Sequence, residues 1–236
     1  MKILYAIQGT GNGHLSRARD IIPILQKKGV ELDIQRLFSK NAIQDEKGQI
    51  LFDFFDKDGR VVDKEVVSLY RSKCASYGIS CLNFSETTRQ FFISDSYASM
   101  IFFVNQYKAR ISFDEAGFVV VGAAFDVELL KIILEKIPEK AKINTVFSSS
   151  ILGRVMDCKI QDLIHGRNCS YTLSKEIVYL KNLKTEKATE ESMDTFSLRK
   201  YCISQGVLQT VRTFKPRKKG VESFYQLNKL ALEDFK

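Results

Sequence analysis

The sequence predicts an α/β fold, with a Rossmann-like parallel sheet in the N-terminal part and a mixed α+β C-terminal part that includes a basic hairpin. Three observations support this. Short apolar runs alternate with segments of helical spacing. Hydrophobic residues make up 44% of the 236, enough for a sizeable core. The longest apolar runs, 100–104 and 118–125, fall far short of the roughly 20 residues of a spanning helix, which excludes an integral membrane protein.

The first 34 residues predict one strand–loop–helix–strand unit. Residues 2–7 form a short apolar run that predicts a buried strand, and the glycine-rich run 8–14 predicts a loop. Apolar positions at helical spacing follow over 16–28, with Pro23 inside the pattern and Gly29 as a C-terminal stop. Residues 30–34 predict the second strand. This order implies a right-handed parallel crossover.

The middle of the chain predicts further strands and helices. Residues 49–56 and 60–67 flank an Asp58-Gly59 turn and predict a hairpin. Residues 91–94, 96–107 and 109–113 predict strand, helix and strand. A turn at 114–117 precedes a strand over 118–122, and 127–137 predicts an amphipathic helix that ends before Pro138. Residues 143–148 predict another strand.

The last quarter of the chain predicts a helix and a basic hairpin. Residues 186–205 predict a helix that ends at Gly206. Residues 207–214 and 221–227 alternate apolar and polar positions on either side of the sequence KPRKKG, which predicts a hairpin with a basic tip. A polar stretch near 182–189 suggests a division into a Rossmann-like α/β domain, 1–182, and a basic helix–hairpin–helix segment, 183–236.

Positive charge is concentrated in this C-terminal segment. The chain carries 36 Lys and Arg against 28 Asp and Glu, a net charge of +8. Residues 181–236 hold 12 basic and 7 acidic side chains, which is +5 of that excess. Such a pole attracts phosphate, nucleic acid or an anionic lipid surface, and it can equally serve solubility as a solvated loop tip. The candidate anion-binding residues are Arg212, Lys215, Arg217, Lys218 and Lys219.

The glycine-rich loop itself predicts anion binding. Gly9, Gly11 and Gly13 allow backbone N–H groups to approach a ligand closely at the start of a helix. The dinucleotide fingerprint requires a third glycine, and the P-loop a Gly-Lys pair; His14 breaks both patterns. A histidine at that position also has a pKa suited to proton transfer.

The run Gly9-Thr10-Gly11-Asn12-Gly13-His14, followed by Arg17, resembles the opening of GT-B glycosyltransferases similar to family 28. The resemblance covers residues 1–34 and implies the acceptor-side domain of an enzyme that transfers a sugar from a nucleotide-sugar to a hydroxyl or phosphate-bearing acceptor. It implies that His14 is the catalytic base and that the loop residues with Arg17 bind the acceptor phosphate. A looser match over 91–113 places Asp95 in the cleft. A donor-binding domain is not evident in residues 115–236.

Two other functions stay open. The helix followed by a basic-tipped hairpin resembles the wing of a winged-helix domain, so the chain is alternatively a nucleic-acid-binding protein. A non-catalytic domain that needs a partner chain is the third reading. Five scattered cysteines without a CxxC pair, together with two histidines, predict reduced thiols, no metal site and a cytoplasmic protein, peripheral to the membrane if the basic segment meets anionic lipid. The sequence implies no cofactor beyond the nucleotide-sugar substrate and leaves the oligomeric state open.

Overall fold

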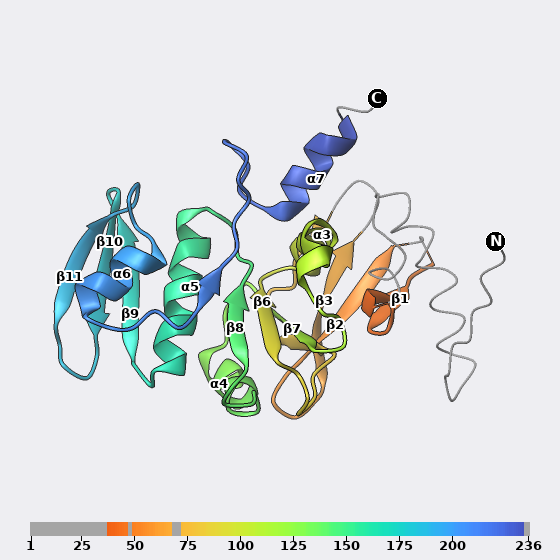
Figure 1. The fold of residues 1–236 in the computed structure, drawn as a ribbon, viewed down its shortest axis with the longest axis horizontal. Coiled ribbons are helices and arrows are strands. Elements are labelled where there is room, and N and C mark those ends of the chain that lie inside the picture. The colour runs from red at the N-terminus through yellow and green to blue at the C-terminus, as the bar shows by residue number, and fades with distance from the viewer. Residues whose placement is uncertain (1–36, 47–48, 68–71, 234–236) are drawn as a thin grey trace.

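A computed structural model describes residues 37–46, 49–67 and 72–233 (Figure 1). The unit predicted for residues 1–34 therefore lies outside the described residues. The strands are β1 (Ala42–Gln44), β2 (Ile50–Phe55), β3 (Val61–Val67), β4 (Ser72–Lys73), β5 (Ile79–Leu82), β6 (Gln90–Ser94), β7 (Ala116–Val121), β8 (Lys142–Thr145), β9 (Cys169–Ser174), β10 (Ile177–Asn182), β11 (Ala188–Ser192) and β12 (Arg212–Thr213). The helices are α3 (Tyr97–Tyr107), the 3-10 turn η1 (Lys108–Arg110), α4 (Val127–Glu135), α5 (Ile151–Ile164), α6 (Leu198–Gln205) and α7 (Phe224–Glu233).

The larger sheet is mixed. Its strand order is β12-β8-β6-β7-β5-β2-β3-β4, and β1 pairs with β2 outside this path. The four strands from β12 to β7 are parallel to one another. The pairs from β7 onward, through β5 and β2 to β3 and β4, are antiparallel. The predicted α/β class is confirmed, and the parallel strands β6, β7, β8 and β12 all come after the antiparallel strands β1 to β5 in the chain.

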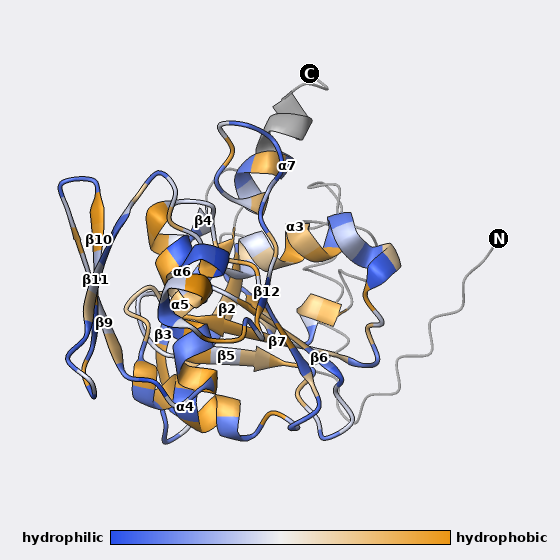
Figure 2. Cartoon of the chain, turned by 60° about the vertical axis from the view of Figure 1, so that its left-hand side comes forward, coloured by the Kyte–Doolittle hydropathy of each residue, from blue (hydrophilic) through white to orange (hydrophobic). Residues whose placement is uncertain are grey.

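Helices cover both faces of this sheet, and each face has its own core. Phe92 points into the core beneath α3 and α7, whereas its neighbour Phe91 points into the core beneath α4, α5 and α6. This follows from the pleat, because successive side chains of a strand point to opposite faces. Figure 2 shows that hydrophobic residues are gathered in the central strands of this sheet.

The chain reverses its direction of winding at β6. From β6 it runs through α3 to β7 on one side, and from β7 it returns through α4 to β8 on the other side of β6. Crossovers in opposite directions mark the carboxyl ends of β6 and β8 as the region where open α/β sheets place ligands, and we call this region the crevice. The residues that follow these two strands are therefore candidate ligand-binding residues.

A second sheet, in the order β11-β10-β9, lies beside α5 and α6 (Figure 1). Val178 and Leu180 of β10 are buried in the core that these helices share. Asp162 on α5 accepts hydrogen bonds from the Tyr171 and Tyr201 hydroxyls, and these contacts tie β9 and α6 to α5. Asn182 is the last residue of β10, and residue 183 begins the turn to β11, which pairs with β10.

Local patterns predicted some elements and missed others. The hairpin of β2 and β3 is confirmed, and Gly59 adopts φ +75° in its turn. The predicted hairpin over 207–227 is wrong. Arg212 and Thr213 pair in parallel with β8, and the second flank is helical because Phe224 packs on α3 against Phe103, with ring centroids 5.3 Å apart. Residues 109–113 form no strand, since η1 continues the turn of α3.

Candidate functional site

An ion pair between a half-buried ammonium and a buried carboxylate lies in the crevice at the carboxyl ends of the parallel strands. Lys215, which follows β12, lies 2.7 Å from a carboxylate oxygen of Asp157 on α5. The same ammonium donates to the carbonyls of Phe147 and Ser148 at 3.0 and 2.9 Å. Asp157 also accepts from the Thr145 hydroxyl at 2.6 Å. Burial raises the pKa of Asp157 and lowers that of Lys215, and their mutual attraction opposes both shifts.

Asp95 stands at the end of β6 in the same crevice. Burial raises the pKa of its carboxyl, and the positive charge of Lys215 acts in the opposite direction. Asp95 does not cap the following helix. Ser96 takes that role, because its hydroxyl accepts from the Ser99 N–H at 3.2 Å. Two of the candidate residues, Asp95 and Lys215, are thus brought together at one end of the sheet.

The amino end of α3 is already occupied by a carboxylate of this chain. Glu65 on β3 is fully buried and accepts from the backbone N–H groups of Tyr97 and Ala98 at 2.6 and 2.9 Å. The Ser96 hydroxyl donates to it at 2.9 Å. Burial raises the Glu65 pKa to about 7, although these donors favour the charged form. The amides that would attract an external anion here are therefore satisfied from within the fold.

The loop between β12 and α7 carries three consecutive exposed cations, Arg217, Lys218 and Lys219. None of the three forms an ion pair with a described residue. We call residues 216–220 the basic loop. It contains Gly220 at φ +77°, a conformation that side chains with a Cβ rarely adopt.

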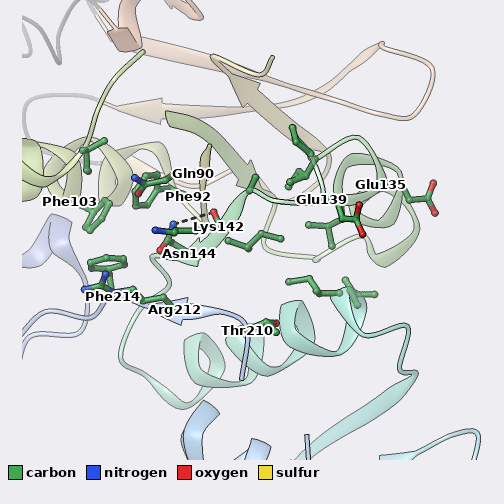
Figure 3. A pocket seen from close by; sticks show the side chains of 18 of the residues that line it. Gln90, Phe92, Phe103, Glu135, Glu139, Lys142, Asn144, Thr210, Arg212 and Phe214 are labelled. Atoms are coloured by element: carbon green, nitrogen blue, oxygen red, sulfur yellow. Dashed lines mark hydrogen bonds between the residues drawn. The ribbon is translucent and has the colours of Figure 1, made fainter. Parts of the chain in front are cut away.

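A pocket of about 880 Å³ lies at the opposite, amino-terminal ends of β6 and β8 (Figure 3). Its apolar lining consists of aromatic and aliphatic side chains: Phe92, Phe103, Tyr107, Phe214, Ile111, Leu134, Ile137, Pro138, Ala141, Ile143, Leu163 and Ile164. Figure 3 shows Phe92, Phe103 and Phe214 at one end, with Lys142, Asn144 and Arg212 beside them, and Glu135 and Glu139 at the other end. We call this the edge pocket, because β12 at the edge of the sheet forms one of its walls.

Four cations line the edge pocket, namely Arg110, Lys131, Lys142 and Arg212, and all four are exposed. Lys131 is paired with Glu128 at 2.7 Å. Arg110, Lys142 and Arg212 form no ion pair with a described residue, and the Arg212 guanidinium lies 4.8 Å from the centre of the Phe214 ring. The aromatic end of the pocket therefore combines apolar surface with uncompensated positive charge.

The residues predicted as sites lie in several different places. Gly9, Thr10, Gly11, Asn12, Gly13, His14 and Arg17 lie outside the described residues. The five cations predicted as one cluster separate: Arg212 lines the edge pocket, Lys215 is half-buried and paired with Asp157 in the crevice, and only Arg217, Lys218 and Lys219 form an exposed group. Sequence reasoning missed Arg110 and Lys142, because no local pattern signals that residues so far apart in the chain meet in one pocket.

Comparisons with known proteins returned matches only among solved structures; no family model and no curated protein matches the chain. One structure is a complex of the bacteriophage T7 lagging-strand DNA polymerase with primase domains of two gp4 subunits, bound to an RNA/DNA hybrid and dTTP. It is 11% identical, with 90% of this chain and 88% of that chain covered and a TM-score of 0.41. Another is the primase fragment of the bacteriophage T7 primase-helicase, 12% identical over 60% of each chain, with a TM-score of 0.40.

The predicted resemblance to GT-B glycosyltransferases is wrong, and with it the assignment as a glycosyltransferase. The similar structures are those of primase domains. The described sheet also departs from a parallel Rossmann-like domain, since β7, β5, β2, β3 and β4 pair in antiparallel fashion. A strand, a glycine-rich loop and a helix are a unit that many folds share, so residues 1–34 could not specify a family.

The described residues contain no helix long and apolar enough to cross a membrane. Within the same residues, no three His, Cys, Asp or Glu side chains are grouped so that they could hold a metal ion. The five cysteines are free thiols.

Proposed function

We propose that this protein binds nucleic acid and that the basic loop contacts the phosphate backbone. The observation that carries the proposal is the display of Arg217, Lys218 and Lys219, which are exposed and unpaired with any described residue. Cations that are free of internal partners can neutralise phosphates without first breaking an ion pair. Such contacts position a protein on nucleic acid and carry no sequence preference.

Both ends of the basic loop are anchored, which distinguishes it from a freely moving charged tail. On one side, Lys215 is fixed by Asp157 in the crevice. On the other side, the Glu222 carbonyl accepts from the Ser149 N–H at 2.7 Å, and Val221 is buried. A loop held at both ends loses less conformational entropy when it binds a ligand than an unrestrained segment does. The anchoring therefore supports a binding role over a purely solubilising one.

The test is the salt dependence of binding to a labelled duplex, with the variant Lys218→Ala/Lys219→Ala. Each phosphate contact contributes about −0.9 to the slope of log affinity against log salt on duplex DNA. We expect the variant to weaken binding and to flatten the slope by about 1.8, since two contacts are lost. The flattening should be the same for unrelated sequences, because phosphate contacts do not read bases.

The matched control is Lys187→Ala/Lys200→Ala, which removes the same charge from two exposed lysines outside the loop. It should leave the slope close to that of the wild type. Equal flattening by both variants would show that only net charge matters and would contradict the assignment of the loop. Binding to anionic vesicles without any binding to duplex or single strands would contradict the proposed function itself.

A further inference from the structure

The edge pocket is separate from the basic loop and from the crevice, and its chemistry points to a ligand of its own. It lies at the amino ends of the parallel strands, whereas Asp95 and Lys215 stand at the carboxyl ends. We propose that the edge pocket binds one unpaired nucleotide, with the base against the aromatic end and the phosphate on Lys142 and Arg212. This inference rests on the proposed function and extends it from phosphate contacts to the preferred form of the nucleic acid.

The size of the edge pocket selects an unpaired nucleotide over a duplex. A volume of about 880 Å³ lies within the range of sites that enclose small molecules. A duplex keeps its bases stacked inside two backbones, so it can place only phosphates and groove edges on such a surface. A single strand can turn one base out of its stack and into the pocket. Proteins that bind single strands commonly hold unstacked bases against aromatic side chains in this way.

The aromatic end supplies the surface that a base needs. Phe214 and Tyr107 are half-buried, with ring centroids 5.4 Å apart, and both line the pocket. The Arg212 guanidinium lies over Phe214 and offers a second flat, charged surface. Bases stack on aromatic rings and on guanidinium planes, and such platforms accept every base because each has a flat π-face.

Asn144 provides a buried hydrogen-bonding group at the same end. Its side chain is almost fully buried, and its amide donates to the carbonyls of Phe91 and Lys142 at 3.1 and 3.4 Å. No described residue donates to its Oδ1, although the residue lines the pocket. An amide oxygen accepts hydrogen bonds, and every base carries at least one N–H donor or amino group when unpaired. Asn144 can therefore accept from the base.

The charges fit a phosphate attached to that base. Lys142 and Arg212 lie beside the rings, and the two glutamates of the pocket, Glu135 and Glu139, lie at the far end (Figure 3). A nucleotide at the aromatic end would therefore meet two cations without facing either carboxylate. Arg212 is also only five residues from Arg217, at most about 17 Å along an extended chain. One strand could thus touch both the edge pocket and the basic loop.

The test compares a short single strand with its matched duplex by fluorescence anisotropy, using the full chain and the variants Lys142→Glu and Lys140→Glu. Both lysines are exposed and close in sequence, but only Lys142 lines the pocket. We expect Lys142→Glu to lower single-strand affinity about tenfold, because a phosphate contact becomes a repulsion, and to change duplex affinity less than about twofold. Lys140→Glu should leave both affinities within about twofold of the wild type. Competition by a free mononucleotide distinguishes a free nucleotide from a nucleotide within a strand as the ligand. If the mononucleotide displaces the strand, the pocket also binds free nucleotides. If it does not, the pocket binds a nucleotide only as part of a strand.

Two results would overturn the inference. If Lys142→Glu lowers the affinity for both forms equally, or for neither, the pocket holds no unpaired nucleotide. In that event Lys218→Ala/Lys219→Ala still reports on the basic loop, so the proposed function survives or fails by its own measurement. If the wild type binds neither form, the pocket inference and the proposed function are both wrong.

Discussion

The two ends of the parallel strands use charge in opposite ways. At the carboxyl ends, Lys215 and Asp157 neutralise each other, and Glu65 fills the amino end of α3. At the amino ends, Lys142 and Arg212 have no ionic partner among the described residues. The crevice matches the place where open α/β sheets usually bind ligands, yet Lys215, Asp157 and Glu65 are each engaged by other groups of the fold. The place of a region in the sheet topology therefore does not by itself identify a binding site. The charged side chains of that region must also be free to contact a ligand.

The same contrast separates stability from binding. A buried ion pair contributes little net stability, but the removal of one partner leaves an uncompensated charge in the interior. An exposed cation contributes little to stability and can change affinity through the counterions that its contacts release. We thus expect substitutions in the crevice to affect folding and substitutions in the edge pocket to affect ligands.

The largest effect is expected from Asp157→Asn. The substitution keeps the shape of the side chain and leaves the half-buried Lys215 without its counter-charge. We expect a cost of about 3 kcal/mol in the free energy of unfolding, the lower end of the range for a broken buried pair, because 22% of the Lys215 side chain is exposed. Urea denaturation measures this value. Lys64→Ala is the matched control, because it removes the 3.1 Å pair with Asp53 near the surface and should cost less than about 1 kcal/mol. If both variants lose the same free energy of unfolding, the ion pair in the crevice is no more important for stability than an ion pair near the surface.

Glu65→Gln should change the pH dependence of stability. The Glu65 pKa is raised from its usual 4.5 to about 7 in the folded protein. Between these values the folded state holds a proton that the unfolded state has released, so stability falls as pH rises through this range and is constant above it. The full loss is about 3 kcal/mol. Glutamine does not titrate, so we expect the difference in unfolding free energy between variant and wild type to shift by that amount between pH 4.5 and pH 7. A pH-independent difference would contradict the raised pKa.

The smallest effect on stability is expected from Arg212→Ala. This exposed guanidinium contacts Phe214 alone among the described rings, and the loss of an exposed cation–π contact costs about 0.5 to 1 kcal/mol. Binding should respond more clearly. If Arg212 contacts a phosphate, the salt slope for a single strand should flatten by about 0.7. Thermal unfolding and anisotropy on the same samples test both parts. A large loss of stability with an unchanged slope would make Arg212 a structural residue.

The sequence predicted the helices and strands that depend on nearby residues. It did not predict those that depend on pairing with residues far away in the chain. The hairpin of β2 and β3 follows from its Asp58-Gly59 turn, and α3 follows from its apolar run after Ser96. The helix expected over 186–205 is in fact β11 followed by α6, because residues 188–192 pair with β10. That pairing fixes a strand in a segment whose own composition favours a helix.

The sequence was limited in the same way in what it could predict about the candidate site residues. The sequence showed that Arg217, Lys218 and Lys219 are clustered, and their exposure agrees with a solvated charged segment. It could not show that Lys215, two residues earlier, is half-buried and paired with Asp157, since that depends on the parallel pairing of β12 with a strand some 70 residues away. The edge pocket could not be predicted from the sequence either, because its lining comes from elements between β6 and β12 that meet only in the folded sheet.

The late position of β12 in the chain has a consequence for how the protein is made. This two-residue strand closes one edge of the larger sheet, but β9, β10, β11 and α6 are synthesised between it and its partner β8. Pairing across such a separation is slow, because a long loop must close before the contact forms. Until residue 213 leaves the ribosome, the edge of β8 is open to strands of other chains. A product that terminates before Arg212 should therefore aggregate, which sedimentation of translation products cut before and after this point would show.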